Sequence, residues 1–138
     1  MSIFIDTGVF VAFHNTQDVN HKKAKETINN IIKGKLGSAY TSDYIFDEAV
    51  TTTLVRTKNH ETALTVGKMI QGELSSPFIK ILEVNSSAFK DAWTLFSRFA
   101  KKGLSFTDCT SIALIKSHNI EKIASFDKDF DEIIPRIQ

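Results

Sequence analysis

The sequence predicts an α/β fold, in which parallel strands alternate with helices along the chain. Short apolar runs such as residues 2–6 and 78–84 are separated by longer segments whose apolar residues have helical spacing. Strands separated in this way pair in parallel through right-handed crossovers. The chain of 138 residues is long enough for a sizeable core, and we expect a single domain over residues 1–138. The order of the strands is left open.

Caps and stop signals set the boundaries of the N-terminal elements. We expect, in order, a strand over 2–6, helices over 9–15 and 18–33, a strand over 38–41, and helices over 44–58 and 61–74. Asp18 is expected to be the N-cap of the second helix, and Gly34 and Gly37 follow its last apolar residues. Pro77, after two serines, ends the last of these helices.

Apolar content defines the elements of the C-terminal half. We expect a strand over 78–84, helices over 87–102 and 106–117, a strand over 120–126, and a turn with an edge strand over 130–137. Five residues of the helix over 87–102 are expected to face inward: Phe89, Ala92, Trp93, Phe96 and Phe99. Gly103 closes that helix, the helix over 106–117 is apolar enough to be buried, and Pro135 suits only an edge strand.

Composition excludes several classes of protein. Hydrophobic residues make up 42% and charged residues 24%, as in ordinary folded domains. A net charge of +1 excludes a bulk polycation, so nucleic-acid contact would need local basic runs such as residues 22–25 or 101–102. The single Cys109 cannot form an internal disulfide. Because neither a signal peptide nor an apolar run of roughly 18 residues is found, we expect a soluble, cytoplasmic protein without a membrane partner.

Four acidic residues stand where parallel α/β proteins place functional groups. Asp6 and Asp127 each follow an apolar strand, and ligands bind beyond the carboxyl ends of such strands. Asp108 opens an apolar helix whose N-terminus is expected to point inward. Glu48 lies on the helix over 44–58, but periodicity does not choose between it and Asp47.

Each of these acids also has a purely structural explanation. Asp6 is placed to cap the next helix, and Asp127 to cap the turn that follows it. Ser105 and Asp108 have the spacing of a capping box, and Glu48 fits a solvated helix face. Taken together the acids favour a shared site, where converging carboxylates would raise one another's pKa values. A hard divalent cation such as Mg²⁺ or Mn²⁺ relieves that repulsion and supports phosphodiester hydrolysis.

The chain resembles a PIN domain (named after the PilT N-terminus), in particular the toxin nucleases of VapBC-type toxin–antitoxin pairs. Five motifs occur in family order and together cover essentially the whole chain: Phe4-Ile5-Asp6-Thr7, residues 18–24 (DVNHKKA), residues 41–48 (TSDYIFDE), Ser105-Phe106-Thr107-Asp108 and residues 125–130 (SFDKDF). The resemblance implies a three-layer α/β/α fold around a parallel sheet of four to five strands. It also implies an Mg²⁺- or Mn²⁺-dependent ribonuclease.

The resemblance assigns roles to individual residues. It implies that Asp6, Glu48, Asp108 and Asp127 carry out catalysis and metal binding. The resemblance thereby selects Glu48 over Asp47. Glu48 would hold a second metal or orient the attacking water. Thr7 and Ser125 match positions that support the acids. Gly8 and Cys109 depart from the usual residues, but neither replaces a metal ligand. The implied reaction is in-line hydrolysis that leaves a 5′-phosphate and a 3′-hydroxyl.

The resemblance also implies partners: an RNA substrate, a second copy in a homodimer, and a protein antitoxin that enters the active-site groove. The helix pair over 44–74 corresponds to the dimer and antitoxin region, with five apolar residues that could line it or pack in the core: Val50, Leu54, Val55, Leu64 and Met69. Arg56, Lys58 and Lys68 are candidates for contact with the RNA backbone, or are simply solvated. Residues that select a substrate sequence stay unknown.

Other functions are compatible with parts of the pattern. A metal-independent ribonuclease would use histidines, but His14, His21, His60 and His118 show no mutual spacing. A haloacid-dehalogenase-like phosphatase needs a second Asp where Gly8 stands, and a phospho-acceptor receiver domain usually carries an acidic pair after its first strand. A non-catalytic PIN-like RNA-binding or scaffold module would normally lack one or more of the acids.

Overall fold

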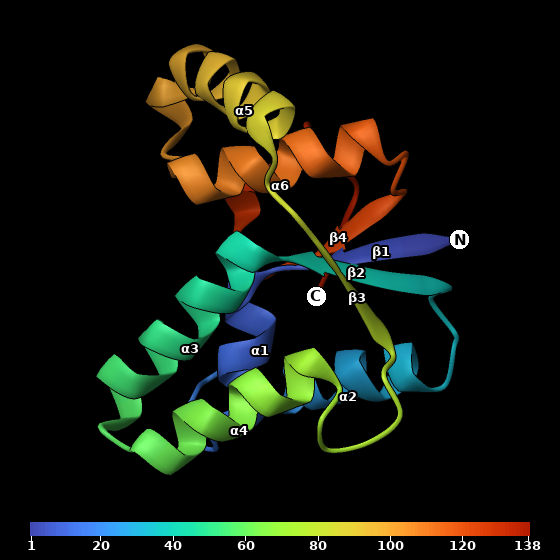
Figure 1. Ribbon diagram of the computed structural model, residues 1–138, viewed down its shortest axis with the longest axis vertical. Helices are drawn as coiled ribbons and strands as arrows, with labels where there is room; N and C mark the ends of the chain where they lie inside the picture. Colours follow the sequence, from blue (N-terminus) through green and yellow to red (C-terminus); the bar gives the residue numbers. More distant parts are fainter.

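A five-stranded sheet lies at the centre of the computed structural model, which describes residues 1–138 (Figure 1). The strands are β1 Ser2–Ile5, β2 Ser38–Ser42, β3 Ile79–Leu82, β4 Lys122–Ala124 and β5 Arg136–Ile137. They lie in the order β3-β2-β1-β4-β5, and every neighbouring pair is parallel. The predicted α/β class and parallel sheet are therefore confirmed, and the strand order is now defined.

Helices cover both faces of this sheet (Figure 1). They are α1 Thr7–His14, α2 His21–Ile32, α3 Asp43–Thr57, α4 His60–Gln71, α5 Ser86–Arg98 and α6 Phe106–Ser117, with short 3₁₀ turns η1 Ala100–Lys102 and η2 Lys128–Phe130. In Figure 1, α5 and α6 lie on one side of the sheet, and α1, α2 and α4 on the other. The predicted three-layer arrangement is confirmed. None of the helices has the length and hydropathy needed to cross a bilayer.

The central strand β1 fixes the position of the functional edge of the sheet. Its residues Ile3, Phe4 and Ile5 are fully buried, because β2 and β4 pair with it on both sides and helices cover both faces. Ile5 is in register with Ala124 of β4. Since β1 and β4 run in the same direction, the residues that follow them emerge at the same edge.

The start of α2 differs from the prediction. Asn20, not Asp18, occupies the N-cap position, and its side chain makes no capping hydrogen bond. The Asp18 carboxylate instead accepts a hydrogen bond from the Asn20 backbone N–H at 2.8 Å, which closes a local turn before the helix. The predicted N-cap role of Asp18 is therefore wrong.

The inward face of α5 is also narrower than predicted. Its buried residues are Ala88, Ala92 and Leu95, whereas Phe89 and Trp93 are 48% and 60% exposed. The small alanines let α5 lie close to α6, so the larger rings are displaced to the edge of this contact. There they form a surface aromatic cluster with Phe106, whose ring centroid lies 5.1 Å from that of Phe89.

Several boundaries also move by a few residues. Helix α5 ends at Arg98, and a 3₁₀ turn covers the rest of the predicted segment. Helix α4 ends at Gln71, because Gly72 adopts the left-handed conformation as its C-cap. The strand predicted over 120–126 is shorter in the structure, where β4 covers only Lys122–Ala124.

Gly37 is required by a close approach of the backbone to the N-terminus. Its φ is +79°, and a Cβ atom there would lie 2.1 Å from the Met1 carbonyl oxygen. We expect Gly37→Ala to lower the free energy of unfolding, measured in urea, by roughly 2 kcal/mol or more. Gly34→Ala is the matched control, because Gly34 has a φ of +76° with no atom within 4 Å. Equal losses in the two variants would contradict this account.

Candidate active site

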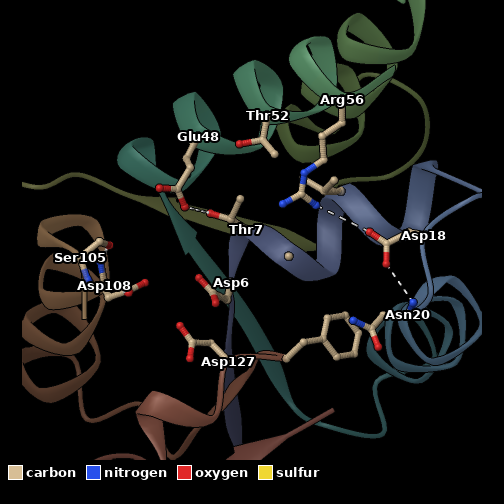
Figure 2. Close-up of a pocket in the computed structure, with 13 residues that line it drawn as sticks. Asp6, Thr7, Asp18, Asn20, Glu48, Thr52, Arg56, Ser105, Asp108 and Asp127 are labelled. Carbon is tan, nitrogen blue, oxygen red and sulfur yellow. Dashed lines mark hydrogen bonds and ion pairs between the residues drawn. The ribbon is translucent and has the colours of Figure 1, made fainter. Parts of the chain in front are cut away.

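A polar pocket of about 500 Å³ opens where the chain leaves β1 and β4 (Figure 2). Only two of its thirteen lining residues, Val11 and Phe126, are hydrophobic. The others are Asp6, Thr7, Gly8, Asp18, Asn20, Glu48, Thr52, Arg56, Ser105, Asp108 and Asp127. All four acids singled out from the sequence therefore lie in one pocket, although they come from distant parts of the chain.

Asp6 is the deepest of these acids, with only 6% of its surface exposed. It occupies the N-cap position of α1, yet its side chain makes no capping hydrogen bond. Its Oδ2 accepts a hydrogen bond from the Ser125 hydroxyl at 2.7 Å instead. Burial raises the pKa of Asp6 to about 7; the Ser125 hydrogen bond opposes this rise, and the charges of Asp108 and Glu48 add to it. Capping of α1 therefore does not explain this carboxylate.

Glu48, rather than its neighbour Asp47, faces the pocket. The Glu48 side chain comes from α3 and its Oε1 accepts a hydrogen bond from the Thr7 hydroxyl at 2.5 Å (Figure 2). Asp47 is exposed and its only hydrogen bond is a long one from Thr51, at 3.5 Å. The orientation of α3 thus directs Glu48, and not Asp47, into the pocket, which the periodicity of the sequence could not decide.

Asp108 lines the pocket and also caps its own helix. With Ser105 it forms a complete capping box, in which the Ser105 N–H donates to Asp108 Oδ2 at 2.9 Å and the Asp108 N–H donates to the Ser105 hydroxyl at 3.0 Å. Burial raises the pKa of Asp108; the hydrogen bonds from Ser105 oppose this, and the charges of Asp127 and Glu48 contribute to the rise. The structural and functional explanations of this residue are therefore compatible.

Asp127 lines the same pocket, and its backbone N–H bonds to the Ser125 hydroxyl that donates to Asp6. Its Oδ1 accepts from the Asp129 N–H at 2.8 Å, which caps the turn η2 as expected. Its own N–H donates to the Ser125 hydroxyl at 3.0 Å, and that hydroxyl donates to Asp6. Ser125, which is fully buried and does not line the pocket, thus connects the residues that follow β1 and β4.

None of the four histidines lines this pocket. His14, His21 and His118 each place a ring nitrogen within hydrogen-bonding distance of a backbone carbonyl, and His60 is the exposed first residue of α4. The geometry therefore offers no paired histidines for a metal-independent ribonuclease at this site.

A model of the PIN domain family matches residues 3–134 of the chain. The chain belongs to the PIN domain family. The resemblance inferred from the five sequence motifs is confirmed.

Several known PIN-family proteins are similar over nearly the whole chain. A VapC ribonuclease of Archaeoglobus fulgidus is 29% identical over 131 residues, which are 94% of this chain and 80% of the relative. The 23S rRNA-specific endonuclease VapC20 of Mycobacterium tuberculosis is 27% identical over 128 residues, which are 93% of this chain and 91% of that protein.

Solved structures agree with the sequence comparisons. The crystal structure of VapC20, described as a Sarcin-Ricin loop cleaving toxin, superimposes with a TM-score of 0.79 at 27% identity and covers 93% of this chain and 92% of its own. A toxin–antitoxin complex from Klebsiella pneumoniae has a TM-score of 0.67 at 12% identity, covers 99% of this chain and 96% of its own, and shares the fold.

The donor atoms of this PIN domain suit a hard divalent cation. Asp6, Glu48, Asp108 and Asp127 offer only carboxylate oxygens, which Mg²⁺ and Mn²⁺ prefer. Repulsion between these acids contributes to the raised pKa values of Asp6 and Asp108. A bound cation would remove this repulsion. No three acidic, histidine or cysteine side chains are already assembled around one point. Water molecules would therefore complete the coordination of an ion bound by one or two of these carboxylates.

Part of the pocket of this PIN domain was not singled out from the sequence. Thr52 had no assigned role, Asn20 entered only as a member of a motif, and Asp18 was predicted as a helix cap and not as a residue of the pocket. The spacing of Glu48, Thr52 and Arg56 by four residues is a helical stripe that could have indicated Thr52. No comparable pattern links this stripe to the segment before α2.

Ser125→Ala is expected to disturb two acids at once. It removes the donor to Asp6 and the acceptor of the Asp127 N–H, so a buried carboxylate loses its partner. We expect the free energy of unfolding at neutral pH to fall by roughly 1–3 kcal/mol and RNA cleavage to fall by about 10- to 100-fold. Chemical denaturation and cleavage rates measure both. Unchanged values would show that Ser125 does not support the acids.

Proposed function

We propose that this PIN domain is a divalent-metal-dependent ribonuclease that hydrolyses RNA phosphodiester bonds and acts as the toxin of a toxin–antitoxin pair. The observation that carries the proposal is one polar pocket lined by four carboxylates: Asp6, Glu48, Asp108 and Asp127. The names of its relatives, a VapC ribonuclease and an rRNA-specific endonuclease, support RNA as the substrate class.

The proposed chemistry divides the acids into two roles. Asp6, Asp108 and Asp127 would hold Mg²⁺ or Mn²⁺, which when bound activates water and neutralises charge on the leaving oxygen. Glu48 would hold a second ion or orient the attacking water. Thr7 fixes one oxygen of Glu48 by its hydrogen bond, and the other oxygen is left free to accept from that water. In-line displacement then leaves a 5′-phosphate and a 3′-hydroxyl.

The proposed protein partners are an antitoxin and a second copy of the chain, in the cytoplasm. Leu54, Val55 and Leu64 on α3 and α4 are at least 40% exposed and would form this contact face. The sequence left open whether Met69 lines this face or packs in the core, and in the structure Met69 is buried in the core. Sedimentation of the purified protein tests the homodimer.

Charge-neutral variants of the four acids test the catalytic proposal. Glu48→Gln is expected to lower the rate of Mn²⁺-dependent cleavage of a long mixed-sequence RNA by roughly a hundredfold or more. Asp47→Asn is the matched control, because Asp47 is adjacent in sequence but outside the pocket. EDTA should abolish cleavage by the wild type. Equal activity of the two variants would overturn the role of Glu48.

The ends of the RNA products distinguish the proposal from its alternatives. A 5′-phosphate is expected, whereas a cyclic 2′,3′-phosphate would indicate histidine acid–base catalysis. RNA binding without cleavage in the presence of Mn²⁺ would identify a non-catalytic binding module. Trapping of an aspartyl-phosphate on Asp6 would identify a phosphatase.

A further inference from the structure

The pocket has a cationic end as well as an acidic one. Glu48, Thr52 and Arg56 lie four residues apart on α3, so they share one face of the helix, and all three line the pocket (Figure 2). At about 1.5 Å per residue, Arg56 lies about 12 Å along the helix from Glu48. Arg56 is the only Lys or Arg among the lining residues.

Asp18 forms a long ion pair with the Arg56 guanidinium at this end of the pocket. The Asp18 carboxylate is 14% exposed, is fixed by the Asn20 N–H at 2.8 Å, and lies 3.8 Å from an Arg56 terminal nitrogen. In Figure 2 the guanidinium reaches from α3 toward the segment that precedes α2. Arg56 makes no other ion pair. At 3.8 Å the contact with Asp18 is not a hydrogen bond, so all five N–H donors of the guanidinium are available to a ligand.

We propose that Arg56, positioned by Asp18, binds a backbone phosphate of the RNA strand beside the bond that is cut. This inference rests on the proposed ribonuclease function, and it adds a phosphate subsite to the same pocket. The planar guanidinium matches two phosphate oxygens at once. The distance along α3 separates this phosphate from the one at the acids, so Arg56 contacts a neighbouring nucleotide and not the reacting group.

The electrostatics of the pocket explain why such a subsite is needed. Five carboxylates line the pocket, because Asp18 adds to the four acids, and they repel the phosphates of RNA, while the net charge of the chain is only +1. A cation inside the pocket therefore contributes more to RNA binding than a cation elsewhere on the surface. Lys58 and Lys68 were equivalent to Arg56 in the sequence, but neither lines the pocket.

The salt dependence of RNA binding tests this subsite. Fluorescence anisotropy with a labelled single-stranded decauridylate, in EDTA so that no strand is cut, gives Kd over a range of potassium chloride concentrations. Arg56→Gln is expected to raise Kd about five- to tenfold at low salt and to reduce the slope of log Kd against log salt by about one. Arg56→Lys should keep the slope. The control Lys116→Gln, at an exposed residue in the last turn of α6 outside the pocket, should keep both values.

An Arg56→Gln variant with the Kd and slope of Lys116→Gln would overturn the subsite. If the wild type nevertheless cleaves RNA in Mn²⁺, the proposed function stays intact and only the subsite is lost. Conversely, a wild type that does not cleave, together with the expected loss of binding in Arg56→Gln, would overturn the catalytic proposal and keep the subsite. Glu61→Gln, which changes an exposed acid of α4, serves as a second surface control.

Discussion

Asp6→Asn is expected to lower kcat for Mn²⁺-dependent RNA cleavage by roughly a thousandfold or more, with the protein still folded. Asp6 directly follows β1, and it is the only buried residue among the four acids. An amide keeps the size of the side chain and still accepts the hydrogen bond from Ser125, so the pocket retains its shape. What the variant loses is the negative charge that the proposed cation needs.

Single-turnover cleavage of a mixed-sequence RNA measures this effect, with circular dichroism as a check on folding. Asp47→Asn carries the same chemical change outside the pocket and should cleave at the wild-type rate. Persistence of Mn²⁺-dependent, EDTA-sensitive cleavage in Asp6→Asn would exclude Asp6 as a metal ligand and, with it, the proposed mechanism.

The stability of the metal-free protein is expected to fall as the pH rises from about 4 to about 7. Folding raises the pKa of Asp6 from 3.8 to about 7, so between these values the folded chain holds a proton that the unfolded chain has released. Each further rise in pH therefore favours unfolding, and the loss is complete above the folded pKa. The shift corresponds to roughly 4 kcal/mol, and Asp108, whose pKa is also raised, acts in the same direction.

Urea denaturation in EDTA across this pH range measures the dependence. Asp6→Asn should be more stable than the wild type at pH 7 and similar to it at pH 4, because the amide does not ionise. Mn²⁺ should restore stability to the wild type at neutral pH and not to Asp6→Asn, since only the carboxylate gains from the cation. A flat profile in the wild type would show that Asp6 stays ionised without cost.

Local patterns were sufficient for most of the fold. Parallel strands buried on both faces read as continuous apolar runs, which is why Ile3, Phe4 and Ile5 were recognised as a strand. The capping box of Ser105 and Asp108 was visible because its partners are three residues apart. Strand order was not predictable, because it depends on pairings between distant segments that no local spacing encodes.

The features that the sequence could not predict depend on packing between helices and strands. Trp93 was expected to face inward because it is large and apolar, but contact with α6 selected the small residues Ala88 and Ala92. The direction in which Glu48 points follows from how α3 crosses the pocket, so family resemblance identified it where periodicity could not. The pairing of Arg56 with Asp18 joins two segments 38 positions apart and had no sequence signal.

The central position of β1 delays assembly of the pocket until β4 has been synthesised. β1 is synthesised well before its second neighbour, β4, because six α-helices and two strands lie between them in the chain. The hydrogen bond from Ser125 to Asp6 spans 119 positions, and Asp127 follows later still. A nascent or prematurely terminated chain therefore lacks one wall of the pocket. The order of the strands therefore prevents a chain that ends before β4 from assembling the acidic site.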